Sequence, residues 1–115
     1  MADSPDAQWA TIVVHLPSEI DMANAKRVGE DLLAAFSRVV RIVIADMSGT
    51  RFCDTSGIHA LVMAHQRAKA SSTEFRVVVP PGEVHRALEK LHLDTMLAIY
   101  PRLDLALIAG DRNDG

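Results

Sequence analysis

Cysteine is almost missing from this chain, because its 115 residues include only Cys53. One cysteine cannot form a disulfide within the chain, and no second thiol stands at the spacing of a zinc site. This usage fits a reducing compartment, so we expect a cytoplasmic protein with no metal and no other cofactor.

The chain also has fewer cationic residues than anionic ones. The 12 Lys and Arg residues are outnumbered by 15 Asp and Glu residues, and the formal net charge is -3. The cations are scattered along the chain and form no stripe. A protein that binds DNA or RNA needs a positive field to meet the phosphates, so a nucleic-acid partner is not expected.

Long apolar runs are absent as well. Charged residues interrupt the apolar segments well before the roughly 18 residues that a membrane span requires. Residues 1–6 are acidic and polar, whereas a secretory signal starts with basic residues followed by an apolar stretch. We therefore expect a protein that is not integral to a membrane.

The motifs of familiar enzymes are missing too. No His-Glu-x-x-His pair occurs among the histidines, and no Gly-x-x-x-x-Gly-Lys loop is present to hold a nucleotide phosphate. Asp54-Thr55 invites comparison with aspartic proteases, but Ser56 stands where those enzymes have glycine, and a lone carboxylate cannot share a proton with a partner. The sequence thus favours a binding protein over an enzyme. The histidines are His15, His59, His65, His85 and His92.

The composition is that of one folded domain. Apolar residues make up 49% of the chain and charged residues 23%. The length suits one domain with its own core, and no linker, repeat or low-complexity segment divides it. We predict a single domain over residues 1–115, with residues 1–7 and 110–115 flexible.

Four segments have the pattern of strands. Residues 9–16 are rich in β-branched side chains and end at Pro17, and residues 75–79 and 97–100 have the same character. Residues 39–45 form a largely apolar run bounded by Asp46 and Gly49, which is typical of a central strand covered on both faces.

Amphipathic helices alternate with these strands. The first is predicted from residue 25, with Asp21 as its N-cap, and the second runs from residues 54–56 to about residue 70. A third follows residues 80–83 with a proline in its first turn, and a fourth spans residues 103–109. Their apolar faces are assigned to Val28, Leu32, Ala35 and Phe36, then Ile58, Leu61, Val62 and Ala68, then Val84, Leu88 and Leu91.

Strands that alternate with helices in this way imply βαβ units with parallel pairing. We predict an α/β fold with a mixed sheet of about four to five strands, parallel in its core, covered by about four helices. Function is expected on the loops that follow the strands.

The segment Asp54-Thr55-Ser56-Gly57 carries the strongest functional signal. It places an acid, two hydroxyls and a glycine where a helix begins after an apolar strand. Thr55 and Ser56 could simply cap the helix. Alternatively, the unpaired N–H groups and positive dipole of a helix start could hold a phosphate on one of these hydroxyls. The residues alone leave both interpretations open.

The distribution of motifs resembles a STAS domain, in particular a free-standing bacterial anti-sigma factor antagonist. The resemblance spans nearly the whole chain and adds residues 81–93 and Tyr100-Pro101 to three main motifs. These motifs are Glu19-Ile20-Asp21, Val43-Ile44-Ala45-Asp46-Met47-Ser48 and Phe52-Cys53-Asp54-Thr55-Ser56-Gly57-Ile58.

The resemblance implies the STAS fold and a phosphorylation-controlled partner. In that family the hydroxyl residue after the aspartate of an Asp-Ser-Ser-Gly turn accepts phosphate from the anti-sigma factor, a serine/threonine kinase. Thr55 matches that position, with Ser56 as the alternative. The unphosphorylated protein would bind the anti-sigma factor, phosphorylation would break the complex, and a phosphatase would restore it. A monomer or weak dimer is expected.

The same resemblance implies a docking surface around the turn, although each member also has a structural interpretation. The acids could cap helices or end a strand, and the glycine could allow close packing. The implied docking residues are Asp21, Asp46, Asp54, Ser56, Gly57 and Ile58.

Two residues depart from the family pattern. Thr55 stands where serine is commoner, which keeps the hydroxyl but adds a methyl group that a serine-preferring kinase could reject. His92 stands where many relatives have glycine, so a left-handed backbone there would cost roughly 1–2 kcal/mol.

Two other roles within the family stay open. Small STAS proteins also serve as accessory subunits of lipid-transport ATPase complexes, and others form stressosome-type scaffolds. Neighbouring genes for a kinase and a sigma factor would favour the regulator, and neighbouring transporter genes would favour the accessory subunit.

Overall fold

A four-stranded parallel sheet forms the centre of the computed structural model, which describes residues 11–37 and 39–110. Its strands are β1 (Thr11–His15), β3 (Ile42–Asp46), β5 (Glu74–Val78) and β6 (Ala98–Tyr100), in the order β1-β3-β5-β6. Every pairing in this sheet is parallel. The predicted α/β class with parallel core pairing is confirmed, whereas the sheet expected to be mixed is parallel throughout the described residues.

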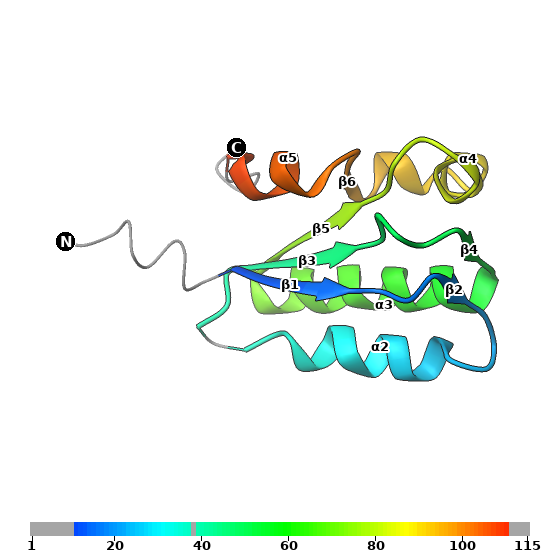
Figure 1. The fold of residues 1–115 in the computed structure, drawn as a ribbon. Coiled ribbons are helices and arrows are strands. Elements are labelled where there is room, and N and C mark those ends of the chain that lie inside the picture. The colour runs from blue at the N-terminus through cyan, green and yellow to red at the C-terminus, as the bar shows by residue number, and fades with distance from the viewer. Residues whose placement is uncertain (1–10, 38, 111–115) are drawn as a thin grey trace.

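A second, two-stranded sheet extends the molecule beyond β1 and β3 (Figure 1). Strands β2 (Glu19–Ile20) and β4 (Phe52–Cys53) pair in parallel, with Glu19 opposite Phe52 and Ile20 opposite Cys53. The sequence pattern missed both strands, because two residues are too few to show a period of two.

Four α-helices lie on the two sides of the sheet in the described part of the chain. Helices α2 (Ala25–Ala34) and α3 (Thr55–Ser71) lie together on one side, and α5 (Leu103–Ile108) lies on the other (Figure 1). Helix α4 (Glu83–Lys90) packs against β4 and against a short 3-10 helix, η1 (Leu93–Thr95). These four helices confirm the prediction of about four.

The core has two parts because neighbouring residues of a strand face opposite sides of the sheet. Val43 and Ala45 of β3 join the large cluster with α2 and α3, whereas Ile44 joins a small cluster with Val78 and Ala106 of α5. All three β3 residues are fully buried. The prediction of a central strand covered on both faces is confirmed.

Several predicted boundaries were wrong. Strand β3 begins at Ile42, not at Val39, which is 76% exposed in the connection from α2. Helix α2 ends at Ala34, although Phe36 beyond it is still buried. An apolar run alone cannot separate a buried connection from the strand that follows it. The predicted start of the first strand, at residues 9–10, lies outside the described residues.

The predicted N-cap of α2 was also wrong. Asn24 occupies the N-cap position, and its side chain makes no cap hydrogen bond. Asp21 lies three residues earlier, where its backbone carbonyl accepts from the N–H groups of Asn24 and Ala25. The chain therefore starts to turn at Asp21, but regular helix begins only at Ala25.

Helix α4 differs from the prediction at both ends. Gly82 is its N-cap, so Pro81 precedes the helix and does not stand in its first turn. Leu91, predicted to be buried, is 50% exposed just after the helix. His92 then has φ 61° and ψ 25°, so the expected left-handed backbone is confirmed at a non-glycine residue.

A fully buried arginine fixes the last helix to the sheet. Arg76 of β5 pairs through Nε with Glu74 Oε2 at 2.7 Å, and its Nη1 donates to the carbonyl of Ala106 at 2.6 Å. Its Nη2 donates to the carbonyl of Gly110 at 2.8 Å. Gly110 is thus attached to the sheet, whereas residues 111–115 and 1–7, expected to be flexible, lie outside the described residues.

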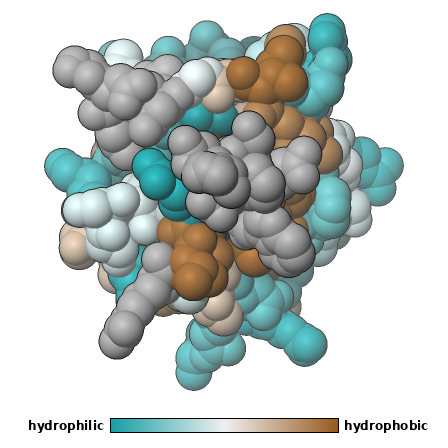
Figure 2. All heavy atoms as spheres, turned by 90° about the vertical axis from the view of Figure 1, so that its left-hand side faces the viewer, coloured by the Kyte–Doolittle hydropathy of each residue, from teal (hydrophilic) through white to brown (hydrophobic). Residues whose placement is uncertain are grey.

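The two ends of the molecule carry different parts of the fold. Figure 2 shows the end where α2 and α5 finish, and apolar atoms gather there in two areas. Helix α3 begins beside β4 at the opposite end (Figure 1). No helix in residues 11–37 and 39–110 has the length and apolar character to cross a membrane.

Candidate partner-binding site

The small β2–β4 sheet brings Asp21 and Asp54 close together. Each aspartate directly follows one of the two paired strands, and the backbone N–H of Asp54 donates to the carbonyl of Ile20 at 3.0 Å. Parallel strands end at the same edge of a sheet, so both acids lie at one corner of the molecule. The two motifs, 33 residues apart in the sequence, thus meet in space.

Asp54 is the N-cap of α3. Its Oδ1 accepts hydrogen bonds from the backbone N–H groups of Ser56 at 2.9 Å and Gly57 at 3.2 Å. The hydrogen bond from the Ser56 hydroxyl, aided by backbone N–H groups that include that of Met22, lowers the pKa of Asp54 below its usual range. The carboxylate is therefore charged at neutral pH.

The two hydroxyls of the turn have different surroundings. Ser56 is half-buried, and its Oγ donates to Asp54 Oδ1 at 2.5 Å. Thr55, the first residue of α3, is exposed, and within the described residues its hydroxyl makes no hydrogen bond. Thr55 is thus the hydroxyl that an external enzyme can reach without breaking a contact.

Gly57 lets the first turn of α3 lie against the small sheet. A Cβ atom at this position would come within 2.6 Å of both Cys53 Sγ and Ile20 Cγ2, closer than packed atoms approach. Ile58, the next residue, is buried in the main core. These two residues hold the Thr55 turn in place from beneath and expose little surface to a partner.

Asp21 shapes the loop beside this turn. Its Oδ1 accepts from the backbone N–H of Ala23 at 2.9 Å, and its own N–H donates to Asn24 Oδ1 at 3.0 Å. Asn24 Nδ2 also donates to the carbonyl of Glu19 at 2.8 Å. The loop from residue 19 to 24 is therefore held by its own side chains next to Asp54.

Asp46 occupies a different environment from the other predicted docking residues. It ends β3, its side chain is 8% exposed, and its Oδ2 lies 2.7 Å from Nδ1 of His15 on β1. Burial would raise its pKa, but hydrogen bonds from Ser48 and the contact with His15 outweigh this effect and lower it. Through its contact with His15, Asp46 joins the ends of β1 and β3.

Two exposed apolar side chains flank the Thr55 turn, and neither was predicted as a site residue. Met22 follows Asp21 and is 84% exposed, and Phe52 of β4 is 49% exposed. Exposed apolar side chains beside charged groups are typical anchors of protein interfaces. Strand alternation would have marked Phe52 as outward-facing, but only after β4 was known.

The described residues near this turn include neither a thiolate nucleophile nor a metal-binding group. Cys53 is buried, and burial with the neighbouring Asp54 charge raises its pKa to about 11, so it is not a thiolate nucleophile. Residues 11–37 and 39–110 contain no group of three or more His, Cys, Asp or Glu side chains that could hold a metal.

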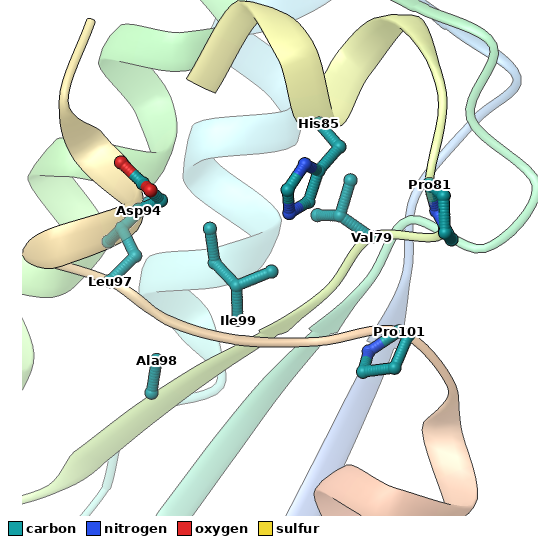
Figure 3. Close-up of a pocket in the computed structure, with 8 residues that line it drawn as sticks. All are labelled: Val79, Pro81, His85, Asp94, Leu97, Ala98, Ile99 and Pro101. Atoms are coloured by element: carbon teal, nitrogen blue, oxygen red, sulfur yellow. The ribbon is translucent and has the colours of Figure 1, made fainter. Parts of the chain in front are cut away.

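A pocket beside β6 holds two further titratable side chains. Figure 3 shows this pocket of about 390 Å3, in which His85 points inward from α4 and Asp94 lies on the far side. The side-chain partner of His85 is Glu89, at 3.7 Å, and most other lining residues are apolar. The exposed Thr55 hydroxyl beside the charged Asp54 cap is the feature that matches the functional signal in the sequence.

The sequence matches the family model described as "STAS domain" over residues 4–106. The chain belongs to the STAS domain family. Solved STAS-like structures agree with this fold. An anti-sigma factor antagonist from Mycobacterium paratuberculosis is 26% identical, with a TM-score of 0.77 and coverage of 85% of this chain and 83% of that one.

Two further relatives show the breadth of the fold. The anti-sigma factor antagonist SpoIIAA in its unphosphorylated form is 19% identical, with a TM-score of 0.66 and coverage of 92% and 91%. A sulfate transporter family protein from Wolinella succinogenes is 17% identical, with a TM-score of 0.74 and coverage of 85% and 82%. At these identities the likeness concerns the fold. No curated protein sequence matches this STAS domain.

Proposed function

We propose that this STAS domain is an anti-sigma factor antagonist, controlled by phosphorylation of Thr55. Unphosphorylated, it binds an anti-sigma factor kinase in the bacterial cytoplasm and so frees a sigma factor for transcription. Phosphorylation releases it, and a separate phosphatase resets it. The chain itself catalyses neither step and acts as a monomer or weak dimer.

The exposed Thr55 hydroxyl is the observation that carries this proposal. It stands on the first residue of α3, next to the charged cap Asp54, while the neighbouring Ser56 hydroxyl is occupied. Solved structures of the family include SpoIIAA of Bacillus in its phosphorylated form, 17% identical with a TM-score of 0.64, which supports phosphorylation as a means of control.

The phosphoryl group comes from ATP held by the partner kinase. The Thr55 oxygen forms the new bond to the γ-phosphorus, the bond to ADP breaks, and the hydroxyl proton passes to a base of the kinase. The turn supplies only the acceptor, and the backbone around it is already fixed by Asp54 and Gly57.

Release follows from the charge that phosphorylation adds. A phosphothreonine brings about -1.5 to -2 charges to a position beside the Asp54 carboxylate. The N–H groups of Ser56 and Gly57, which could otherwise neutralise a phosphate, already donate to Asp54. These two N–H groups are therefore not free to offset the added charge, and burying it beside the Asp54 carboxylate under a partner becomes costly.

The other docking residues have different roles in this proposal. Asp21, Asp54 and Ser56 form the polar contact surface, while Gly57 and Ile58 set its position. Asp46 contributes by holding the ends of β1 and β3 together through its contact with His15, and the loops of the surface depart from these ends.

Titration of variants against the candidate anti-sigma factor tests the proposal. Thr55→Ala should bind like the parent and resist inactivation by ATP, and Thr55→Glu should fold normally and bind at least tenfold more weakly. Ser56→Ala is the matched control and should still be inactivated. Parent-like binding by Thr55→Glu, or a phosphate that maps only to Ser56, would overturn the assignment of Thr55.

A further inference from the structure

A groove between β4 and α4 lies directly beside the Thr55 turn. It has a volume of about 340 Å3, and its walls include Arg51, Phe52, Glu83, Arg86 and Lys90. Cys53, which also lines it, is two residues from Thr55, so the two Cα atoms are within about 8 Å of each other. The groove thus belongs to the surface that a partner at Thr55 would cover.

Helical spacing explains why the α4 residues face this groove. Glu83, Arg86 and Lys90 stand at positions i, i+3 and i+7 of the helix, which share one face. Val84 and Leu88 occupy the buried face, so the charged face is held outward. Phe52 supplies an exposed aromatic ring on the opposite wall.

The groove is positively charged. Three cations and one acid line it, and all four are exposed. In the described part of the chain, no carboxylate lies within ion-pair distance of Arg51, Arg86 or Lys90. Their charge is therefore available to a partner, although the chain as a whole has a formal net charge of -3.

The side of the small sheet toward β2 and the strand ends carries acids. Glu19 pairs with Phe52 across the two strands, and Asp21 and Asp54 follow at the strand ends. An anionic segment would be repelled from this side and attracted into the groove, because like charges raise and opposite charges lower the energy of encounter. The charge pattern therefore assigns one place to an acidic ligand.

We propose that the groove binds an acidic segment of the anti-sigma factor, with an apolar side chain packed on Phe52. This inference rests on the proposed function and adds the chemistry of the partner. It also explains release, because a phosphate on Thr55 would stand beside the bound acidic segment and repel it.

The test compares two charge reversals at equivalent helix positions. Lys90→Glu changes the last turn of α4 in the groove, and Lys69→Glu changes the last turn of α3 far from it. Affinity of the full chain for the candidate anti-sigma factor is measured at low and moderate salt, and thermal unfolding monitors the fold.

The expected result is at least tenfold weaker binding for Lys90→Glu, and more for Arg86→Glu with Lys90→Glu, with a smaller salt dependence than the parent. Lys69→Glu should stay within twofold. If Thr55→Glu loses binding while the groove variants bind like the parent or better, the groove proposal fails and the proposed function stands. If the parent binds no anti-sigma factor, both fail.

Discussion

The carboxylate of Asp54 acts both as a helix cap and as a surface charge, and two substitutions separate these roles. Asparagine caps a helix nearly as well as aspartate, whereas alanine loses the cap at a cost of about 1 kcal/mol. Urea denaturation should therefore show a loss for Asp54→Ala and almost none for Asp54→Asn.

Binding should respond to Asp54→Asn even though stability does not. If the charge contacts the partner, the affinity for the anti-sigma factor should fall about tenfold, which is roughly 1.4 kcal/mol. Parent-like affinity of Asp54→Asn would show that Asp54 serves the fold alone.

Gly57 offers a sharp test of how closely α3 approaches the small sheet. A Cβ atom there would lie 2.6 Å from Cys53 Sγ, so Gly57→Ala should destabilise the protein by about 1–3 kcal/mol. This loss outweighs the gain in helix propensity, which is at most about 1 kcal/mol.

Gly29→Ala is the matched control, since Gly29 also lies inside a helix. Its Cβ atom would meet Ala60 Cβ at 3.6 Å, an ordinary contact, so this variant should be neutral or more stable than the parent. Equal effects of the two substitutions, measured by thermal unfolding, would contradict the packing described for Gly57.

Among the helices and strands, those with several turns or a buried centre were the ones that sequence pattern could predict. The apolar spacing of α3 predicts an amphipathic helix, and the dense apolar run that ends at Asp46 predicts a buried strand. The sequence pattern did not predict strands β2 and β4, because their pairing comes from the loops that bring Ile20 and Cys53 together. Asp21 was misread as a cap for a different reason, since its carboxylate accepts from Ala23 within the preceding loop and regular helix begins only at Ala25.

The candidate site was only partly predictable. The order Asp54-Thr55-Ser56 indicated both a cap and an acceptor, and the structure gives the cap to Asp54 and the exposed hydroxyl to Thr55. The exposure of Phe52 and the charged face of α4 could not be assigned to this site, because only the fold places α4 beside β4.

The attachment of α5 to β5 depends on Arg76. Replacing it with methionine removes one member of a buried ion pair and leaves the carbonyls of Ala106 and Gly110 without their donor. We expect Arg76→Met to cost about 3–5 kcal/mol and to speed hydrogen exchange in α5.

Arg102→Met is the control for this loss. Arg102 pairs with Asp104 at 3.0 Å, two residues away as in the buried pair, but both side chains are largely exposed. Its loss should cost less than about 1 kcal/mol. Similar losses in the two variants would mean that burial of Arg76 does not strengthen its contacts.

For the chain as one unit, stability should fall in two steps as the pH drops. Burial and the nearby Lys69 lower the pKa of His65 below 6.5, so the unfolded chain takes up that proton first and stability declines as pH falls through this range. Asp46 and Asp54 have pKa values lowered below 3.8, so their contribution is present above that pH and is lost as pH falls through their folded-state values.

Urea denaturation from pH 8 to pH 3 would resolve the two steps. His65→Gln should remove the upper step and leave the lower one, and Asp54→Asn should reduce the lower one. An upper step of unchanged size in His65→Gln would contradict the burial assigned to this histidine.

Binding of the anti-sigma factor by the same protein before and after phosphorylation would settle whether Thr55 is a charge-operated release point. The kinase and ATP would convert the chain, peptide mapping would locate the phosphate, and calorimetry would give the two affinities. We predict one phosphate on Thr55 and at least tenfold weaker binding. Equal affinities with Thr55 fully phosphorylated would contradict this account.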